Sequence, residues 1–119
     1  MKLNHLNLTV TDAAETAGFL TKYFGLRHID GAPPASATMA FLTDENSMVL
    51  SMFRGKRGVE VEYPGIFHIG FIQESEEQVT QINERLRSDG YAVGKPSRLH
   101  GSWTFYFKAP GGFTIEVLR

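Results

Sequence analysis

The chain contains an internal repeat, and this repeat limits the possible folds more than any other feature of the sequence. The segment from His5 to Asp12 (HLNLTVTD) can be aligned with the segment from His68 to Ser75 (HIGFIQES). Each segment alternates between polar and apolar residues in the manner of a strand, begins at a histidine and ends at a residue that commonly caps helices. A repeat with so long a period predicts two similar supersecondary units in a chain of 119 residues.

Each repeated strand is followed by the pattern of a capped amphipathic helix. We expect the first helix between Asp12 and Gly25 and the second between Ser75 and Gly90, each with a capping-box residue three positions after its N-cap. The apolar face expected for the first helix consists of Ala13, Ala17, Leu20 and Phe24. The buried stripe expected for the second helix consists of Val79, Ile82 and Leu86.

After each helix the pattern returns to strands. The expected short strands and hairpins cover residues 27–30, 38–53, 93–98 and 103–118. Aligning the two hairpins brings Ser51 opposite Glu116. We therefore predict an α+β fold of paired β-α-β-β-β modules that share one core, with mixed sheets, in a single domain. Module one is expected at 1–53, a linker at 54–64 and module two at 65–119.

Three residues of metal-ligand type occupy related positions on the expected strands. His5, His68 and Glu116 each project away from the bulky apolar row of their strand, so we expect them to share the concave face of one sheet. A single histidine or glutamate in a strand is more often structural, but repeat-equivalent placement favours a joint role. Two imidazoles and a carboxylate leave coordination positions open and suit Fe, Mn, Ni or Zn better than calcium. His28 and His100 lack such placement and are expected at the surface.

The composition of the chain excludes several other classes of function. The chain has no cysteine, which excludes disulfides, thiolate ligands and a cysteine nucleophile. Its net charge of −1 indicates neither a nucleic-acid partner nor a membrane-surface partner. No stretch is apolar for long enough to span a bilayer, and the N-terminus lacks the apolar core of a signal peptide. We therefore expect a cytoplasmic protein that acts on a small molecule.

The segments NHLNLTVTD, FHIGF and FYFKAPGGFTIEV, placed around two capped helices, resemble the vicinal oxygen chelate superfamily over essentially the whole chain. That group includes glyoxalase I, extradiol dioxygenases and bleomycin-binding proteins. The resemblance implies two modules whose sheets form a cup, and a divalent metal ion held by His5, His68 and Glu116. It also implies Lewis-acid chemistry on a substrate whose neighbouring oxygens chelate the metal, with Glu116 as the catalytic carboxylate.

Departures from the family pattern bear on the reaction. Glyoxalase I usually has a fourth ligand, a glutamate, at the position that Ser51 fills here, and this departure argues against ordinary glyoxalase chemistry. Strand alternation places further residues on the concave face, and Trp103 is considered as a loop contact to the substrate. For each of these residues a packing role is at least as good an explanation. The candidates for substrate contact are Asn7, Thr9, Ser51, Phe53, Thr104, Tyr106 and Trp103.

Three functions remain in competition. The first is a metal-dependent enzyme on a small oxygenated substrate, with dioxygenase-like chemistry slightly favoured because the fourth ligand is missing. The second is a glyoxalase-type lyase or isomerase, and the third is a non-catalytic protein that binds a drug or metabolite. Small members of the resembled family commonly pair modules between subunits, so we expect a homodimer with sites shared across the interface.

Overall fold

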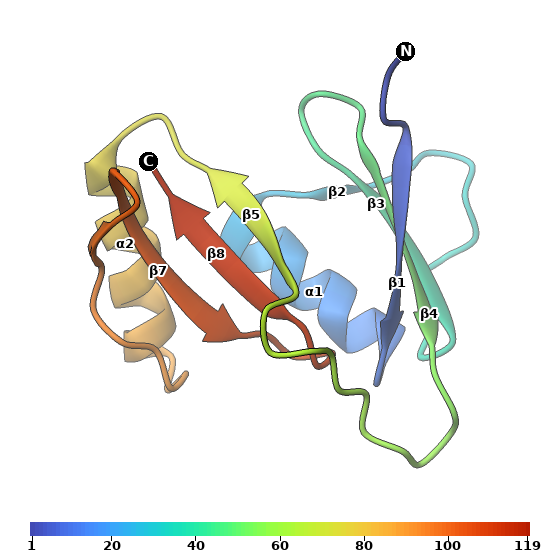
Figure 1. Ribbon diagram of the computed structural model, residues 1–119. Helices are drawn as coiled ribbons and strands as arrows, with labels where there is room; N and C mark the ends of the chain where they lie inside the picture. The colour runs from blue at the N-terminus through green and yellow to red at the C-terminus, as the bar shows by residue number, and fades with distance from the viewer. The chain divides into compact units, whose positions relative to one another are not determined.

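The structure, a computed structural model, describes all residues from 1 to 119. It contains eight strands and two helices in two similar runs, as the repeat predicts (Figure 1). The first run is β1 (His5–Val10), α1 (Ala13–Phe24), β2 (Arg27–His28), β3 (Met39–Thr43) and β4 (Val49–Arg54). The second run is β5 (His68–Ile72), α2 (Glu76–Ser88), β6 (Ser97–Leu99), β7 (Ser102–Lys108) and β8 (Thr114–Leu118). The expected α+β class and β-α-β-β-β order are confirmed.

The chain forms two compact units, which we call unit one and unit two. Unit one consists of Met1–Glu62 together with Pro110–Gly112, and unit two consists of Tyr63–Ala109 together with Phe113–Arg119. Each unit contains a four-stranded mixed sheet, in the order β1-β4-β3-β2 in unit one and β5-β8-β7-β6 in unit two. Strand β1 is parallel to its neighbour β4, and β5 is parallel to its neighbour β8. All other neighbouring strands are antiparallel.

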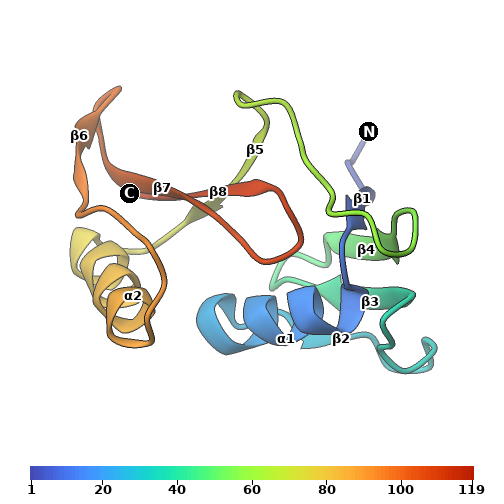
Figure 2. The same ribbon diagram turned by 90° about the horizontal axis from the view of Figure 1, so that it is seen from below.

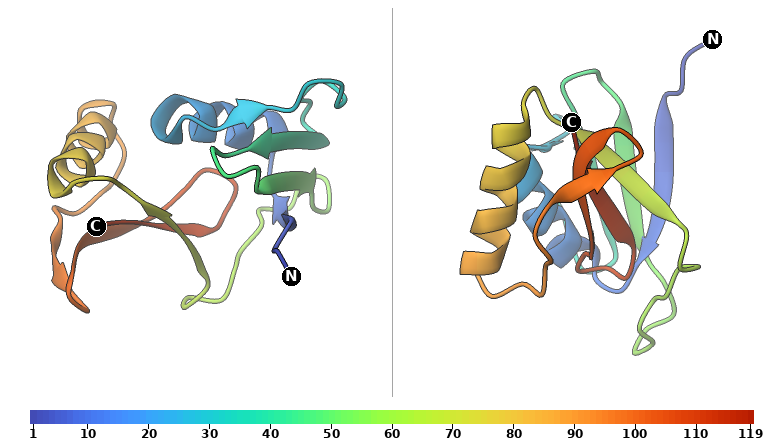
Figure 3. Two further views of the ribbon diagram at one scale, coloured as in Figure 1. Left: turned by 90° about the horizontal axis from the view of Figure 1, so that it is seen from above. Right: turned by 60° about the vertical axis from the view of Figure 1, so that its left-hand side comes forward.

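In unit one, α1 covers one face of the sheet (Figure 3, left). The helix begins at Asp12, whose carboxylate accepts a hydrogen bond from the backbone N–H of Glu15 at 2.8 Å. It ends at Gly25, which has the left-handed conformation (φ 67°) that glycine adopts without steric cost. The buried side of the helix includes Phe19 and Tyr23, whereas the expected Phe24 is only half-buried. The fully buried side chains opposite the helix are Leu8, Val10, Ala40, Leu42 and Met52.

In unit two, α2 lies on one side of β7 and β8 (Figure 2; Figure 3, right). Ser75 caps the helix by accepting a hydrogen bond from the backbone N–H of Gln78 at 3.2 Å. The buried positions include Asn83, which is polar, and not the expected Ile82, which is half-buried. The fully buried apolar side chains of this unit are Val79, Leu86, Phe113, Ile115 and Val117.

Asn83 also explains why the strand expected at 93–98 begins only at Ser97. Its side-chain amide donates to the carbonyl oxygen of Gly94 at 2.7 Å, so this backbone group is bound to the helix and not to a neighbouring strand. Pro96 then lacks the N–H that a sheet ladder needs. Strand β6 starts only at Ser97 and pairs over three residues with β7.

No helix of the structure combines the length and the apolar character that crossing a membrane would require.

Candidate functional site

Two of the three expected ligands meet on one face of the unit-two sheet. His68 begins β5, and Glu116 lies in the neighbouring parallel strand β8, where it is paired with Gly70. Their side chains leave the sheet on the side away from α2, because Ile115 and Val117 on the other side are fully buried. His68 Nε2 lies 3.5 Å from Glu116 Oε2, with 41% of the histidine side chain and 13% of the glutamate side chain exposed.

The backbone fixes the tautomer of His68. Its Nδ1 lies 3.0 Å from the carbonyl oxygen of Ile66, and a carbonyl can only accept, so Nδ1 carries the hydrogen. In the neutral ring, Nε2 then presents its lone pair to a carboxylate oxygen that is also an acceptor. Two acceptors facing each other need a proton or a metal cation between them. A metal with bonds of about 2.1 Å would hold two tetrahedral ligands roughly 3.4 Å apart, so the pair fits such an ion.

Glu116 lies beside two hydroxyl-bearing residues of β7. Thr104 Oγ1 donates to Oε1 of the carboxylate at 3.0 Å. Tyr106 pairs with Glu116 in the sheet. Hydrogen bonding of its phenol group to Glu116, followed by burial and repulsion from the negative charge, raises the pKa of Tyr106 above its ordinary value. The Tyr106 ring also makes an edge contact with the His68 ring, at 5.4 Å between centroids.

The equivalent face of unit one carries the third expected ligand. His5 begins β1 and is paired with Val49, as His68 is paired with Thr114, so the two histidines have the same place in their sheets. Its Nδ1 contacts Asn4 Oδ1 at 3.0 Å, an arrangement that leaves Nε2 with its lone pair when the amide oxygen accepts. The expectation that all three ligands share one sheet is wrong, because the strands divide into two sheets. Neither unit by itself gathers three histidine or acidic side chains.

Ser51 occupies the place in unit one that Glu116 occupies in unit two. It is paired with Asn7 in the parallel ladder, as Glu116 is paired with Gly70. Its Oγ donates to the Asn7 side-chain oxygen at 2.9 Å, and only 9% of the residue is exposed. The position is therefore filled by a small hydrogen-bonded pair with no carboxylate.

The remaining expected contact residues lie in different environments. Thr9 and Phe53 are paired neighbours on the same face as His5, and the Phe53 ring contacts the edge of the Phe41 ring at 5.8 Å. Trp103, by contrast, lies in β7 on the α2 side of its sheet, and its indole N–H donates to Thr80 Oγ1 in α2 at 3.0 Å. Residues alternate along a strand, so Trp103 and Tyr106 project to opposite faces. We therefore leave Trp103 out of the proposed site.

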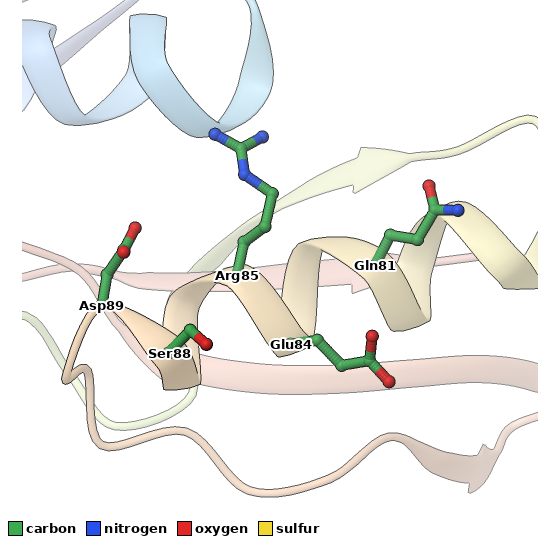
Figure 4. A pocket seen from close by; sticks show the side chains of 5 residues that line it. All are labelled: Gln81, Glu84, Arg85, Ser88 and Asp89. Carbon is green, nitrogen blue, oxygen red and sulfur yellow. The ribbon is translucent and has the colours of Figure 1, made fainter.

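Sequence reasoning did not find the groups that orient the two histidines, Asn4 and the carbonyl of Ile66. A backbone carbonyl leaves no signal in the sequence, and its use depends on how the chain enters β5. Figure 4 shows a separate hollow on the surface, formed only by side chains of α2 and its C-cap. Its lining residues, Gln81, Glu84, Arg85, Ser88 and Asp89, include none of the candidate site residues.

The two mixed four-stranded sheets and two helices match the fold of solved glyoxalase and dioxygenase family proteins. Residues 2–117 match the sequence model of the Glyoxalase/Bleomycin resistance protein/Dioxygenase superfamily, and the chain belongs to this superfamily. Its members generally use divalent metals, typically bind small-molecule substrates and often form dimers.

Three proteins that are described with different functions are similar to the chain. A solved structure from Bacillus cereus described as a "possible Glyoxalase" is 47% identical, with a TM-score of 0.88 over 100% of this chain and 99% of that one. A lactoylglutathione lyase from Agrobacterium tumefaciens is 19% identical and shares the fold, with a TM-score of 0.73 over 98% and 92%. A 2,2',3-trihydroxybiphenyl dioxygenase from Sphingomonas paucimobilis is 28% identical over 97% of this chain. The chain spans 40% of the length of that dioxygenase.

Proposed function

We propose that the chain is a divalent-metal-dependent enzyme acting on a small substrate whose neighbouring oxygens chelate the metal, with His5, His68 and Glu116 as the ligands. The observation that carries the proposal is the pair formed by His68 and Glu116, with Nε2 of the histidine 3.5 Å from Oε2 of the carboxylate. His5 is included because it has the same place and the same free Nε2 in the other sheet.

Dioxygenase-type chemistry is the reaction we favour. It needs two histidines and one carboxylate with several open positions, and Ser51 offers no fourth carboxylate. The similarity to the trihydroxybiphenyl dioxygenase supports this choice, within the 40% of that protein that the chain spans. The 47% identity to the possible glyoxalase favours the second candidate, a lyase or isomerase that uses water or a substrate oxygen in place of the fourth ligand.

Groups around His68 and Glu116 would keep these two residues able to bind a metal ion and place a proton donor beside it. When bound, a divalent ion supplies Lewis-acid stabilisation of negative charge on a substrate oxygen. The Ile66 carbonyl holds the hydrogen on Nδ1 of His68 and keeps Nε2 available. Tyr106 keeps its phenolic proton at neutral pH, as a phenol ordinarily does, and Glu116 raises its pKa further. With 38% of the residue exposed, the phenol is also accessible to a bound substrate.

Metal analysis of the protein purified without chelators tests the proposal. We expect about one divalent ion per chain for the wild type, since each chain has one ligand set. Glu116→Ala should lose the ion and all turnover while the protein stays folded, because no thiolate is present to replace the carboxylate. Glu84→Ala, which removes an exposed carboxylate on α2, is the matched control and should keep both.

Two results would count against the proposal. Full metal occupancy and turnover in Glu116→Ala would show that the carboxylate is wrongly chosen. A wild-type protein that binds no metal after repletion, but still binds small molecules, would favour a non-catalytic binding protein.

A further inference from the structure

The two units differ at the two β-hairpin positions next to Glu116. Tyr106 lies where unit one has Phe41, and Thr104 lies where unit one has Met39, as the matching strand registers show. Both differences place a hydroxyl group where unit one has an apolar side chain. Thr104 donates a hydrogen bond to the carboxylate of Glu116, and Tyr106 is the strand partner of Glu116. The hydroxyl groups thus occur only in the unit that carries the candidate carboxylate ligand.

Thr104 is the buried member of this pair. Only 1% of the residue is exposed, whereas Tyr106 is open to solvent on one side. Its Oγ1 lies 3.0 Å from Oε1 of Glu116 and 2.9 Å from the carbonyl oxygen of Val117. Both neighbours accept hydrogen bonds, so the single hydroxyl proton is held between them. The hydroxyl therefore has no freedom to serve water or a substrate, and its partners are fixed by the β7–β8 register.

The two oxygens of Glu116 are consequently in different environments. Oε1 accepts a hydrogen bond from the buried hydroxyl group of Thr104, and Oε2 lies 3.5 Å from Nε2 of His68. The geometry points to Thr104 as a positioning residue that holds Oε1 and so keeps Oε2 turned toward Nε2 of His68, where one metal ion could bind both atoms. The inference rests on the proposed function, because it takes His68 and Glu116 to be ligands.

A carboxylate bound through one oxygen keeps another coordination position open for substrate. A carboxylate that could turn freely would be able to chelate through both oxygens, or would lose rotational freedom when a metal binds. Some residues hydrogen-bond a metal ligand without touching the metal. Removing such a residue commonly weakens metal binding by roughly 10- to 100-fold. Thr104 should therefore affect both the metal affinity and the coordination geometry through its hydrogen bond to Glu116.

The alternative is that Thr104 only fills a buried position and bonds the Val117 carbonyl. Three substitutions separate the two roles. Thr104→Val keeps the shape and removes the hydroxyl, while Thr104→Ser keeps the hydroxyl and loses a methyl group. Thr104→Ala forms a pair with Thr104→Ser that differs in the hydroxyl alone, and this pair gives the comparison if the valine variant does not fold. Thr16→Val is the matched control, since Thr16 is fully buried and donates to the Asp12 carbonyl at 2.7 Å.

The experiment is calorimetric titration of the metal-free full-length protein with Zn(II), followed by the visible spectrum of the Co(II) form. We expect Thr104→Val and Thr104→Ala to bind zinc about 10- to 100-fold more weakly and to shift the Co(II) bands. Thr104→Ser and Thr16→Val should stay close to the wild type in both measurements.

Each contrary outcome has its own meaning. Wild-type affinity and spectrum in Thr104→Val and Thr104→Ala would overturn the inference and leave the proposed function standing. Equal losses in the serine and alanine variants would also overturn it, because shape and not the hydroxyl would then matter. A wild-type chain that takes up neither metal would overturn the proposed function and the inference together.

Discussion

Tyr106 is a site residue whose pKa depends on the neighbouring carboxylate. Its hydrogen bond to Glu116 raises the pKa of the phenol above the ordinary value near 10. The folded state therefore binds this proton more tightly than the unfolded chain does. The stability that results is fully present below pH 10 and is lost as the pH rises through the folded-state pKa.

This shift can be measured in the metal-free protein by titrating tyrosine with near-ultraviolet absorbance. Subtracting the curve of Tyr106→Phe isolates Tyr106 from the other three tyrosines of the chain. We expect the midpoint of the difference curve to lie above 10 in the wild type and to fall in Glu116→Gln, which removes the negative charge. A midpoint that is the same in both proteins would show that Glu116 does not control the phenol.

Ser51 allows the ligand set to be enlarged. A glutamate there would lie at the position equivalent to Glu116 and would displace the hydrogen bond between Ser51 and Asn7. If this face of unit one contributes to the metal site, Ser51→Glu should raise zinc affinity or change the preference between zinc and nickel. Ser51→Ala is the control that removes the hydroxyl without adding a ligand. Identical affinities for all metals in Ser51→Glu would mean that Ser51 does not face the metal.

At the scale of residues, strand alternation predicted which face each candidate side chain occupies, but not what holds it. His68 and Glu116 lie on the face opposite the buried apolar rows, as the alternation indicated. The bond from His68 to the Ile66 carbonyl depends on the backbone path before β5, which no residue pattern records. The sequence places Trp103 at the first position of an expected hairpin and offers it as a loop contact to the substrate. It lies one position inside β7, and its indole N–H donates to α2.

At the scale of elements, the turn at Gly111-Gly112 between β7 and β8 depends on the absence of a side chain. Gly112 has a φ of 97°, and a Cβ there would overlap the carbonyl group of Val61. Gly112→Ala should therefore destabilise the protein by at least about 2 kcal/mol. Gly18, exposed in α1, has nothing within 4 Å of an added Cβ, so Gly18→Ala should stabilise by about 0.5–1 kcal/mol. Urea unfolding measures both changes, and equal effects of the two substitutions would contradict this explanation.

The helices were predicted more accurately than the short strands because their ends are chemically marked. Asp12 and Ser75 cap α1 and α2. Helix α1 ends directly before the expected Gly25, and the C-cap of α2, Asp89, directly precedes the expected Gly90. The strand expected at 93–98 has no such markers, and its apolar alternation was weak evidence. The buried Asn83 redirects this segment through a long-range hydrogen bond that local sequence cannot show.

At the scale of the whole molecule, the repeat predicted two units of the same order, and the superfamily assignment followed from the same segments. The assembly of the chain is a separate question. In each unit the strand that begins with a candidate histidine, β1 or β5, lies at the edge of its sheet. An edge strand offers unpaired backbone groups to another chain. We expect a homodimer, and sedimentation equilibrium at micromolar concentration should give twice the mass of 13.3 kDa. A single-chain mass would contradict this prediction.

If the dimer shares its sites, His5 of one chain acts with His68 and Glu116 of its partner, and two defective chains can restore one site. Neither His5→Ala nor Glu116→Ala should retain metal alone, since each lacks one of three ligands. In a mixed dimer, one site would combine the intact His5 of one chain with the intact His68 and Glu116 of the other, while the second site would carry both defects. An equal mixture after subunit exchange should therefore hold about a quarter of the wild-type metal, because half of its dimers are mixed. Differently tagged chains confirm the exchange by co-purification. If exchange is complete and no metal returns, each site belongs to a single chain.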